Sequence, residues 1–417
     1  MIRTLVTKHV SKSTIFQPSS LATVRCFAAA PAGGKVERTA LYDFHVKNGG
    51  KIVNFGGYNL PVQYSDQGIS ASHLHTRKFV SIFDVSHMLQ TYIRGKDAVE
   101  CMESVCTADI RGAANGSGSL TVFTNDQGCI LDDLIVTKVQ EDLLYVVSNA
   151  AMKSQDMSIM ETAVNKFRSQ GKDVAIEFLT SADQSLIALQ GPTAVEALSS
   201  LTPADLTKLY FMNTLVTEVA GVKNCRITRC GYTGEDGVEI SIPSSHVEQV
   251  TEALLQQTKQ QVKMAGLGAR DSLRLEAGLC LYGSDIDNKT TPIEAALAWL
   301  VAKRRRAEEN FPGAQIVNKQ LKEGVQRRRV GLKMDPSAKP PPARAGVEIY
   351  KDEQKVGHIT SGCPSPSLNI NIAMGYIKEE YKQAGCPVQL KIRDRFYSAE
   401  VAKMPFVKTT YYVKPKQ

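Results

Sequence analysis

Apolar residues flank two adjacent acids in residues 130–137, which read ILDDLIVT. The β-branched and leucine content, together with the turn residues at 125–128, predicts a strand that leaves a hairpin. Successive side chains of a strand point to opposite faces, so Asp132 and Asp133 lie on different faces. An unpaired buried carboxylate is costly, and each acid therefore needs solvent, a donor, a cation or a ligand. The pattern alone leaves open which of the two is functional.

Helical and strand patterns follow one another irregularly after this segment, which predicts an α+β fold. Apolar residues at helical spacing over 156–167 predict a packing helix, and a second helix is predicted from about 269 to 278. Residues 225–230 and 238–243 predict a hairpin around a glycine-rich loop. In its second strand Val238, Ile240 and Ile242 form the core face, and Glu239 lies on the other face.

Arg270 and Arg274 lie four residues apart on one face of the predicted helix at 269–278. At this spacing they could bind a carboxylate of a ligand, or they could pair with Asp271 and Glu276. The spacing alone favours pairing within the protein.

A proline-rich loop at 335–342 separates the mixed region from short strands that continue to the end of the chain. Short strands at such spacing predict a small barrel or sandwich domain over residues 325–417. Two basic clusters, at 303–306 and 327–329, precede it. Such clusters are usually solvated, although clustered arginine also favours docking of an acidic partner.

Residues 1–36 contain basic residues, serine and threonine but no acid, which is typical of a mitochondrial or plastid transit peptide. Five of the cations lie there, so the net charge of +8 needs no nucleic-acid partner to explain it. No apolar run approaches the ~20 residues of a membrane span, which argues against membrane insertion.

The sequence offers no pattern for a metal or a dinucleotide. Nine cysteines are scattered without Cys-x-x-Cys spacing, and His73 and His75 have no third ligand nearby. Residues 266–271 begin like a dinucleotide fingerprint but lack its third glycine, and no Walker A pattern occurs. We therefore predict no metal, no disulfide framework and no flavin domain.

Five motifs in order resemble the aminomethyltransferase family, the T-proteins of the glycine cleavage system. The resemblance runs from about residue 38 to about residue 412 and implies a three-domain cloverleaf around a central opening, in the mitochondrial matrix. It implies two interleaved α+β domains within 37–310 and a C-terminal β-barrel at 325–417. The motifs are FDVSHM at 83–88, LDDLIV at 131–136, RCGYTGEDG at 229–237, ARDSLRLEAG at 269–278 and SGCPSP at 361–366.

The resemblance also implies an activity without metal or flavin. In this family the methylene carbon passes from the S-aminomethyl-dihydrolipoyl arm of H-protein to tetrahydrofolate, giving 5,10-methylenetetrahydrofolate and ammonia. The H-protein is acidic, which would favour docking on the arginines at 304–306. A folate-binding or assembly protein of the same fold that lacks catalysis is the alternative. Related flavoprotein dehydrogenases need a flavin domain that this chain lacks.

The same resemblance assigns the site. Asp133 matches the catalytic aspartate, which leaves Asp132 as a backbone-bonded or solvated strand residue. Glu239, Arg270 and Tyr411 match folate contacts, although the neighbouring Tyr412 could take the place of Tyr411. The surrounding pocket would be formed by Met88, Leu120, Tyr145, Val147, Asn149, Tyr232 and Trp299.

Overall fold

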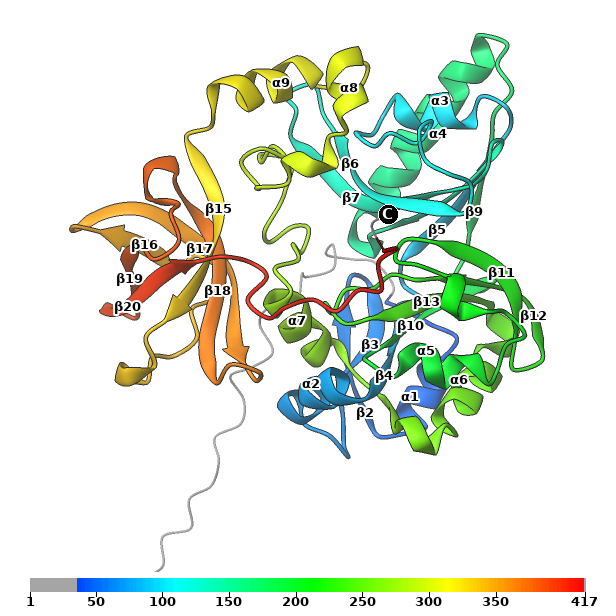
Figure 1. Ribbon diagram of the computed structural model, residues 1–417, viewed down its shortest axis with the longest axis horizontal. Helices are drawn as coiled ribbons and strands as arrows, with labels where there is room; N and C mark the ends of the chain where they lie inside the picture. Colours follow the sequence, from blue (N-terminus) through cyan, green and yellow to red (C-terminus); the bar gives the residue numbers. More distant parts are fainter. Residues whose placement is uncertain (1–35, 416–417) are drawn as a thin grey trace, which may run out of the picture.

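The computed structural model describes residues 36–415, which form an α+β fold with a closed β-barrel at its C-terminal end (Figure 1). The predicted transit peptide lies, apart from its last residue, outside the described residues. Within residues 36–415 no helix is long and apolar enough to cross a membrane.

The first part of the fold is a six-stranded mixed sheet with the strand order β11-β12-β13-β10-β4-β14. The predicted hairpin of β12 and β13 is confirmed, and Val238, Ile240 and Ile242 are fully buried on its core face. A three-stranded sheet packs beside it. The elements are β1 (Glu37–Arg38), α1 (Tyr42–Lys47), β2 (Gly50–Phe55), β3 (Tyr58–Tyr64), β4 (Val80–Asp84), β10 (Gln184–Gln190), α5 (Ala194–Ser199), β11 (Thr214–Val219), β12 (Val222–Thr228), β13 (Gly237–Pro243), α6 (Val247–Leu255) and β14 (Val262–Met264).

The second part is a five-stranded antiparallel sheet with the order β6-β7-β8-β5-β9. The chain enters it after β4 and returns to the first sheet at β10, so the two parts are interleaved. The predicted helix at 156–167 is confirmed within α4, whose buried residues pack on this sheet. The elements are β5 (Leu89–Arg94), α3 (Ala98–Glu103), β6 (Ser117–Thr124), β7 (Ile130–Gln140), β8 (Leu143–Ser148), α4 (Lys153–Ser169) and β9 (Ala175–Leu179).

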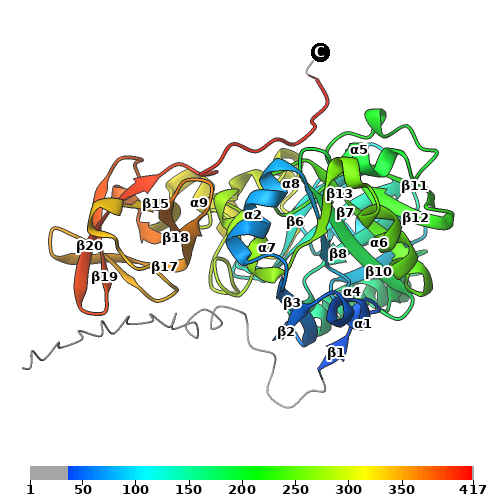
Figure 2. The ribbon, with the colours of Figure 1, turned by 90° about the horizontal axis from the view of Figure 1, so that it is seen from below.

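The third part is a closed six-stranded barrel, which confirms the predicted small barrel. In Figure 2 it stands to one side of the two sheets, with the helices α2 (Ile69–Lys78) and α7 (Leu267–Glu276) between them. A connection containing α8 and α9 leads into it. The elements are α8 (Lys303–Glu308), α9 (Ala314–Glu323), β15 (Arg327–Met334), β16 (Glu348–Lys351), β17 (Gln354–Ser365), β18 (Ile370–Lys378), β19 (Pro387–Ile392) and β20 (Arg395–Ala402).

The basic cluster at 304–306 is only partly exposed, and docking of an acidic partner there stays a prediction. Arg305 is fully buried, and Arg304 forms ion pairs with Glu103, Asp109 and Glu308. Arg306 donates to the carbonyl oxygens of residues 298 and 301. The arginines of α8 therefore have partners within the protein, and acids from α3, the following loop and α8 itself neutralise Arg304 and Arg305.

Helix α7 (Leu267–Glu276) connects the barrel to the rest of the molecule through buried charge. Arg274 forms ion pairs with Asp271 and Asp285, and its guanidinium also donates to the Ser361 hydroxyl of the barrel. The predicted pairing of Arg274 with Asp271 is confirmed. The predicted pairing with Glu276 is wrong, because Glu276 takes its partners from other elements.

Glu276 collects donors from helix α2 (Ile69–Lys78) and from the barrel. His73 Nε2 lies 3.0 Å and Arg77 Nη2 2.9 Å from its Oε2 atom. The Ser365 hydroxyl donates to Oε1 over 2.5 Å, and the Ser367 hydroxyl donates to Oε2 over 2.8 Å. Burial alone would raise the pKa of Glu276, but the hydrogen bonds from His73 and the serines lower it to about 2. One carboxylate thus ties α2, α7 and the barrel together.

We predict that Glu276→Gln lowers the free energy of unfolding by about 3 kcal/mol at pH 7, because it leaves buried donors around a neutral amide. The measurement is urea unfolding, with Glu161→Gln on the exposed face of α4 as the matched control. Because the Glu276 pKa is depressed, its stabilisation is present above about pH 4 and is lost as the pH falls toward about 2. A Glu276→Gln protein as stable as the control would contradict this role.

Candidate functional site

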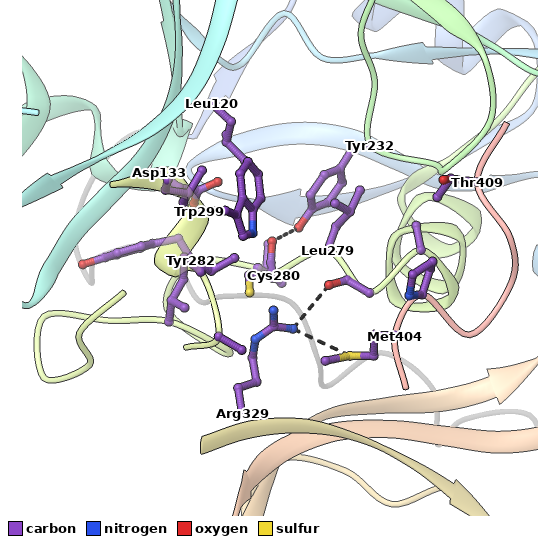
Figure 3. A pocket seen from close by; sticks show the side chains of 18 of the residues that line it. Leu120, Asp133, Tyr232, Leu279, Cys280, Tyr282, Trp299, Arg329, Met404 and Thr409 are labelled. Carbon is purple, nitrogen blue, oxygen red and sulfur yellow. Dashed lines mark hydrogen bonds between the residues drawn. The ribbon is translucent and has the colours of Figure 1, made fainter. Parts of the chain in front are cut away.

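A cavity of about 1270 Å³ lies where the two sheets, helix α7 and the barrel meet. Its walls come from β6, β7 and β8, from β13 and α7, and from the segment at 277–302. The barrel adds β15 and residues 402–405, and the C-terminal segment adds residues 409 and 411. Figure 3 shows labelled side chains from several of these segments, among them Leu120, Asp133, Tyr232 and Arg329, around a common space. The cavity therefore requires all three parts of the fold.

Asp133 lies in the middle of β7 with its carboxyl group in the cavity wall. Burial, with a further contribution from the charge of Asp132, raises the pKa of Asp133 to about 7, and a hydrogen bond from Asn149 opposes this shift. The Asn149 Nδ2 atom donates to Asp133 Oδ1 over 3.0 Å. A carboxyl group with such a pKa is half protonated near neutrality, which suits proton transfer.

Asp132, on the opposite face of β7, is fully buried. It accepts a hydrogen bond from the Asn149 backbone over 3.1 Å, so of the two predicted settings the backbone-bonded one is confirmed and the solvated one is wrong.

Glu239 and Arg270 form the polar part of the wall opposite β7. Glu239 stands on β13, where burial raises the pKa of its carboxyl group and Arg270 opposes the rise. The Arg270 guanidinium lies 4.5 Å from the centre of the Tyr232 ring. No carboxylate in the described part of the chain lies within ion-pairing distance of Arg270, so its donors are available to a ligand. The cavity wall thus offers an acceptor, a cation and an aromatic ring.

Aromatic residues form much of the remaining wall. The Tyr232 hydroxyl donates to the backbone carbonyl of Cys280, as the dashed line in Figure 3 shows. Trp299, at the short helical turn Ala298–Leu300, is 64% exposed. Tyr411 stacks on Phe211 with ring centres 4.3 Å apart and lines the cavity, and burial raises its pKa to about 12.

The structure distinguishes Tyr411 from its neighbour Tyr412, which the sequence could not do. Tyr412 stacks on Tyr210 with ring centres 5.3 Å apart and is 40% exposed, outside the cavity wall. Of the two tyrosines, only Tyr411 can touch a ligand in the cavity.

Ten of the eleven predicted site residues line this one cavity. The exception is Tyr145, whose ring is buried behind Glu239 beside the Arg226 guanidinium, 4.8 Å from the ring centre. The Tyr145 hydroxyl donates to Gln90 over 2.7 Å, so a structural partner already uses its polar end. The ten residues in the wall are Met88, Leu120, Asp133, Val147, Asn149, Tyr232, Glu239, Arg270, Trp299 and Tyr411.

Sequence reasoning missed the barrel's contribution, above all Arg329. This residue is only 6% exposed and forms no ion pair with a described carboxylate. Its guanidinium donates to the backbone carbonyls of residues 278 and 295 and lies against the sulfur atoms of Met374 and Met404 (Figure 3). The sequence pattern at 327–329 predicts a solvated cluster, because a local pattern does not reveal the segment that covers Arg329.

The arrangement is suited to a flat heterocycle with adjacent donors. Apolar and aromatic surface can hold the ring, Glu239 can accept its N–H groups, and Asp133 can exchange a proton with it. In residues 36–415 no group of three histidine, cysteine or acidic side chains is placed to hold a metal. His73, for example, bonds to Ser272 and Glu276 instead.

Two family models and several known proteins match nearly the whole chain. The family described as the GCVT N-terminal domain matches residues 41–305, and the glycine cleavage T-protein C-terminal barrel domain matches residues 327–408. The chain is 53% identical over 378 residues to "Aminomethyltransferase, mitochondrial" of Homo sapiens, covering 90% of this chain and 91% of that one. It is 48% identical over 389 residues to the protein of the same name from Solanum tuberosum, covering 93% of each.

A solved structure shows the same fold. The crystal structure of the glycine cleavage system aminomethyltransferase T from Bartonella henselae has a TM-score of 0.83 and 36% identity, covering 90% of this chain and 99% of that one.

We predict that Asp133→Asn raises the free energy of unfolding at pH 8 by about 1–3 kcal/mol, since the wild-type carboxyl group must ionise in a buried place. Its pKa is about 7 when folded, against ~3.9 unfolded, so wild-type stability falls as the pH rises through this window. The two proteins should be equally stable near pH 4. Urea unfolding at both pH values measures this, with the exposed Asp126→Asn as control, and equal stability at pH 8 would contradict it.

Proposed function

The chain belongs to the glycine cleavage T-protein family, and we propose from this premise that its central cavity binds tetrahydrofolate with Asp133 as the catalytic acid. The chain carries out the tetrahydrofolate-dependent aminomethyl transfer of glycine cleavage in the mitochondrion. The single observation that supports the proposed site best is the position of Asp133 in the wall of an aromatic cavity that also holds Glu239 and Arg270.

The proposed second substrate is the aminomethyl group carried on the dihydrolipoyl arm of H-protein. Its C–N bond breaks to release ammonia, and a new bond forms between the same carbon and N5 of tetrahydrofolate. Attack by N10 then breaks the C–S bond and closes the ring of 5,10-methylenetetrahydrofolate. The two protons lost from N5 and N10 leave on ammonia and on the dihydrolipoyl thiol, so no electrons are exchanged with an outside oxidant.

The residues in the wall fit these steps. A carboxylate at Asp133 stabilises the positive charge that develops as the electrophile forms, and its pKa of about 7 lets it also relay a proton. Glu239 accepts hydrogen bonds from adjacent ring N–H and amino groups of the pterin. Arg270 donates to pterin acceptors, and Tyr232 and Tyr411 enclose the ring. Positioning the two substrates supplies much of the rate enhancement.

We predict that Asp133→Asn lowers kcat by about 100-fold, because the amide can neither carry charge nor exchange a proton. The assay follows ammonia release and 5,10-methylenetetrahydrofolate formation from aminomethylated H-protein and tetrahydrofolate. Asp126→Asn, exposed in the turn of the same hairpin, is the matched control. Retention of most of the activity by Asp133→Asn would refute its role. A wild-type protein that binds folate without turnover would favour the alternative of a binding or assembly protein.

A second prediction concerns binding alone. Glu239→Gln presents an amide N–H where the pterin also presents donors, so KM for tetrahydrofolate should rise about tenfold while kcat changes less. Steady-state kinetics with tetrahydrofolate as the varied substrate measure the split, and Glu248→Gln on the exposed face of α6 serves as control. A fall in kcat at unchanged KM would show that Glu239 acts in the chemistry and does not merely hold the pterin.

A further inference from the structure

Two more carboxyl groups lie directly behind Asp133, in the layer between β7 and helix α4. Asp132 projects from β7 on the face opposite to Asp133, and Asp156 projects from the first turn of α4. Both are 0% exposed. Their surroundings are apolar, because Leu134 of the same strand face and Met160 of the helix belong to one hydrophobic core.

Neither acid is paired with a cation among residues 36–415, and the donors of Asn149 reach only Asp132 of the pair. The Asn149 backbone N–H donates to Asp132 Oδ2 over 3.1 Å, and the Asn149 Nδ2 atom donates to Oδ1 over 2.9 Å. Both oxygens of Asp156 are buried and form no hydrogen bond among the described residues, although the Ser148 side chain is near enough to lower the pKa of Asp156. No lysine or arginine of residues 36–415 forms an ion pair with either acid. A second ionised carboxylate in this place would be very costly.

The side chains of Asp132 and Asp156 are close enough for each to affect the pKa of the other, and burial raises the pKa of both groups. Two charged carboxylates side by side in an apolar layer without a cation would repel each other strongly. We therefore expect the pair to hold one proton. The other titratable groups near this pair are Asp133 on β7 and Tyr282 in the segment after α7.

The Asn149 side chain connects Asp132 to Asp133, which lines the cavity. Its Nδ2 atom lies 2.9 Å from Asp132 Oδ1, 3.0 Å from Asp133 Oδ1 and 3.0 Å from the Asp133 carbonyl oxygen. The amide group is held with its donors toward the two acids, because a rotated amide would turn its oxygen toward the charge of Asp132. Asp133 is thus fixed from behind by an orientation that Asp132 sets.

We propose that Asp132, one of a buried pair of acids that holds one proton, is a positioning residue for Asp133 and acts through the side chain of Asn149. The proposal rests on the proposed catalytic role of Asp133. It gives a functional role to Asp132, which we predicted from the sequence to be only structural. It also explains why an apolar strand carries two acids side by side. One acid faces the substrate, and the other faces the helix that keeps the first in place.

The kinetic test compares Asp132→Asn with Asp156→Asn. Asp132→Asn leaves a single acceptor for the two Asn149 donors, so we expect kcat to fall about tenfold with KM for tetrahydrofolate within about threefold of wild type. The charge of Asp132 contributes to raising the Asp133 pKa, so its removal should also move the acidic limb of the kcat/KM profile to lower pH. Asp156→Asn leaves both hydrogen bonds from Asn149 to Asp132 in place, so kcat and the limb should stay close to wild type.

A double-mutant cycle tests the route through Asn149. If Asp132 acts through this side chain, adding Asp132→Asn to Asn149→Ala should lower kcat no further than Asn149→Ala alone. Additive losses in the double variant would overturn the proposal. So would an Asp132→Asn protein that matches the Asp126→Asn control in both kcat and pH profile, or an Asp156→Asn protein as impaired as Asp132→Asn.

An infrared measurement tests the pair without relying on turnover. At neutral pH the wild-type protein should show the C=O stretch of a protonated carboxylic acid that disappears in Asp156→Asn but persists in Asp133→Asn at a pH above the titration of Asp133. Absence of such a band from the wild type would overturn the proposal even if an Asp132 variant fails to fold. A failed role for Asp133 is recognised separately, by an Asp133→Asn protein that turns over like the wild type.

Discussion

Burial of charge on helix α7 is the constraint on which the arrangement of the whole molecule depends. A buried charge is tolerable only when its partners surround it, and the partners of Arg274 and Glu276 come from α2, from the segment after α7 and from the barrel. The relative position of the parts is therefore fixed by a few hydrogen-bonded groups at one junction. Arg270, one turn earlier on the same helix, is held at the cavity wall as a consequence.

In the candidate site, the balance between burial and hydrogen bonding is the reverse of that at Glu276. At Glu276 hydrogen bonds outweigh burial and lower the pKa to about 2, whereas at Asp133 burial outweighs the hydrogen bonds and the charge of Arg270 and raises the pKa to about 7. The first carboxylate stabilises the fold in its charged form. The second is kept in a place where its charged form is disfavoured, and a reaction that develops positive charge next to it can use that charge. Glu276 and Asp133 carry the same functional group but have different pKa values and different roles, because the donors around them differ.

Much of the fold could be predicted from the sequence where a pattern is local. The alternation in β7 showed that its two acids face opposite ways, and the alternation in β13 separated Glu239 from its core neighbours. Resemblance to a family named ten residues that do meet in one cavity. The predictions that were wrong concern residues whose surroundings depend on which segments pack together. The sequence predicts solvated side chains for Arg305 and Arg329, but α3 covers the first and the segment before α8 covers the second. It predicts Tyr145 in the pocket wall, but the Tyr145 hydroxyl bonds to Gln90 instead.

The charge state of Asp133 is the central claim, and it can be measured directly. In protein labelled with ¹³C at aspartate side-chain carboxyls, the signal that disappears in Asp133→Asn can be followed by NMR as the pH is varied. The account predicts a titration midpoint near 7, because the group is buried beside Asp132 and the opposing effects of Asn149, its own backbone N–H and Arg270 are smaller. A midpoint at the ordinary aspartate value of about 4 would contradict it, since the cavity would then hold a fully ionised carboxylate at neutral pH.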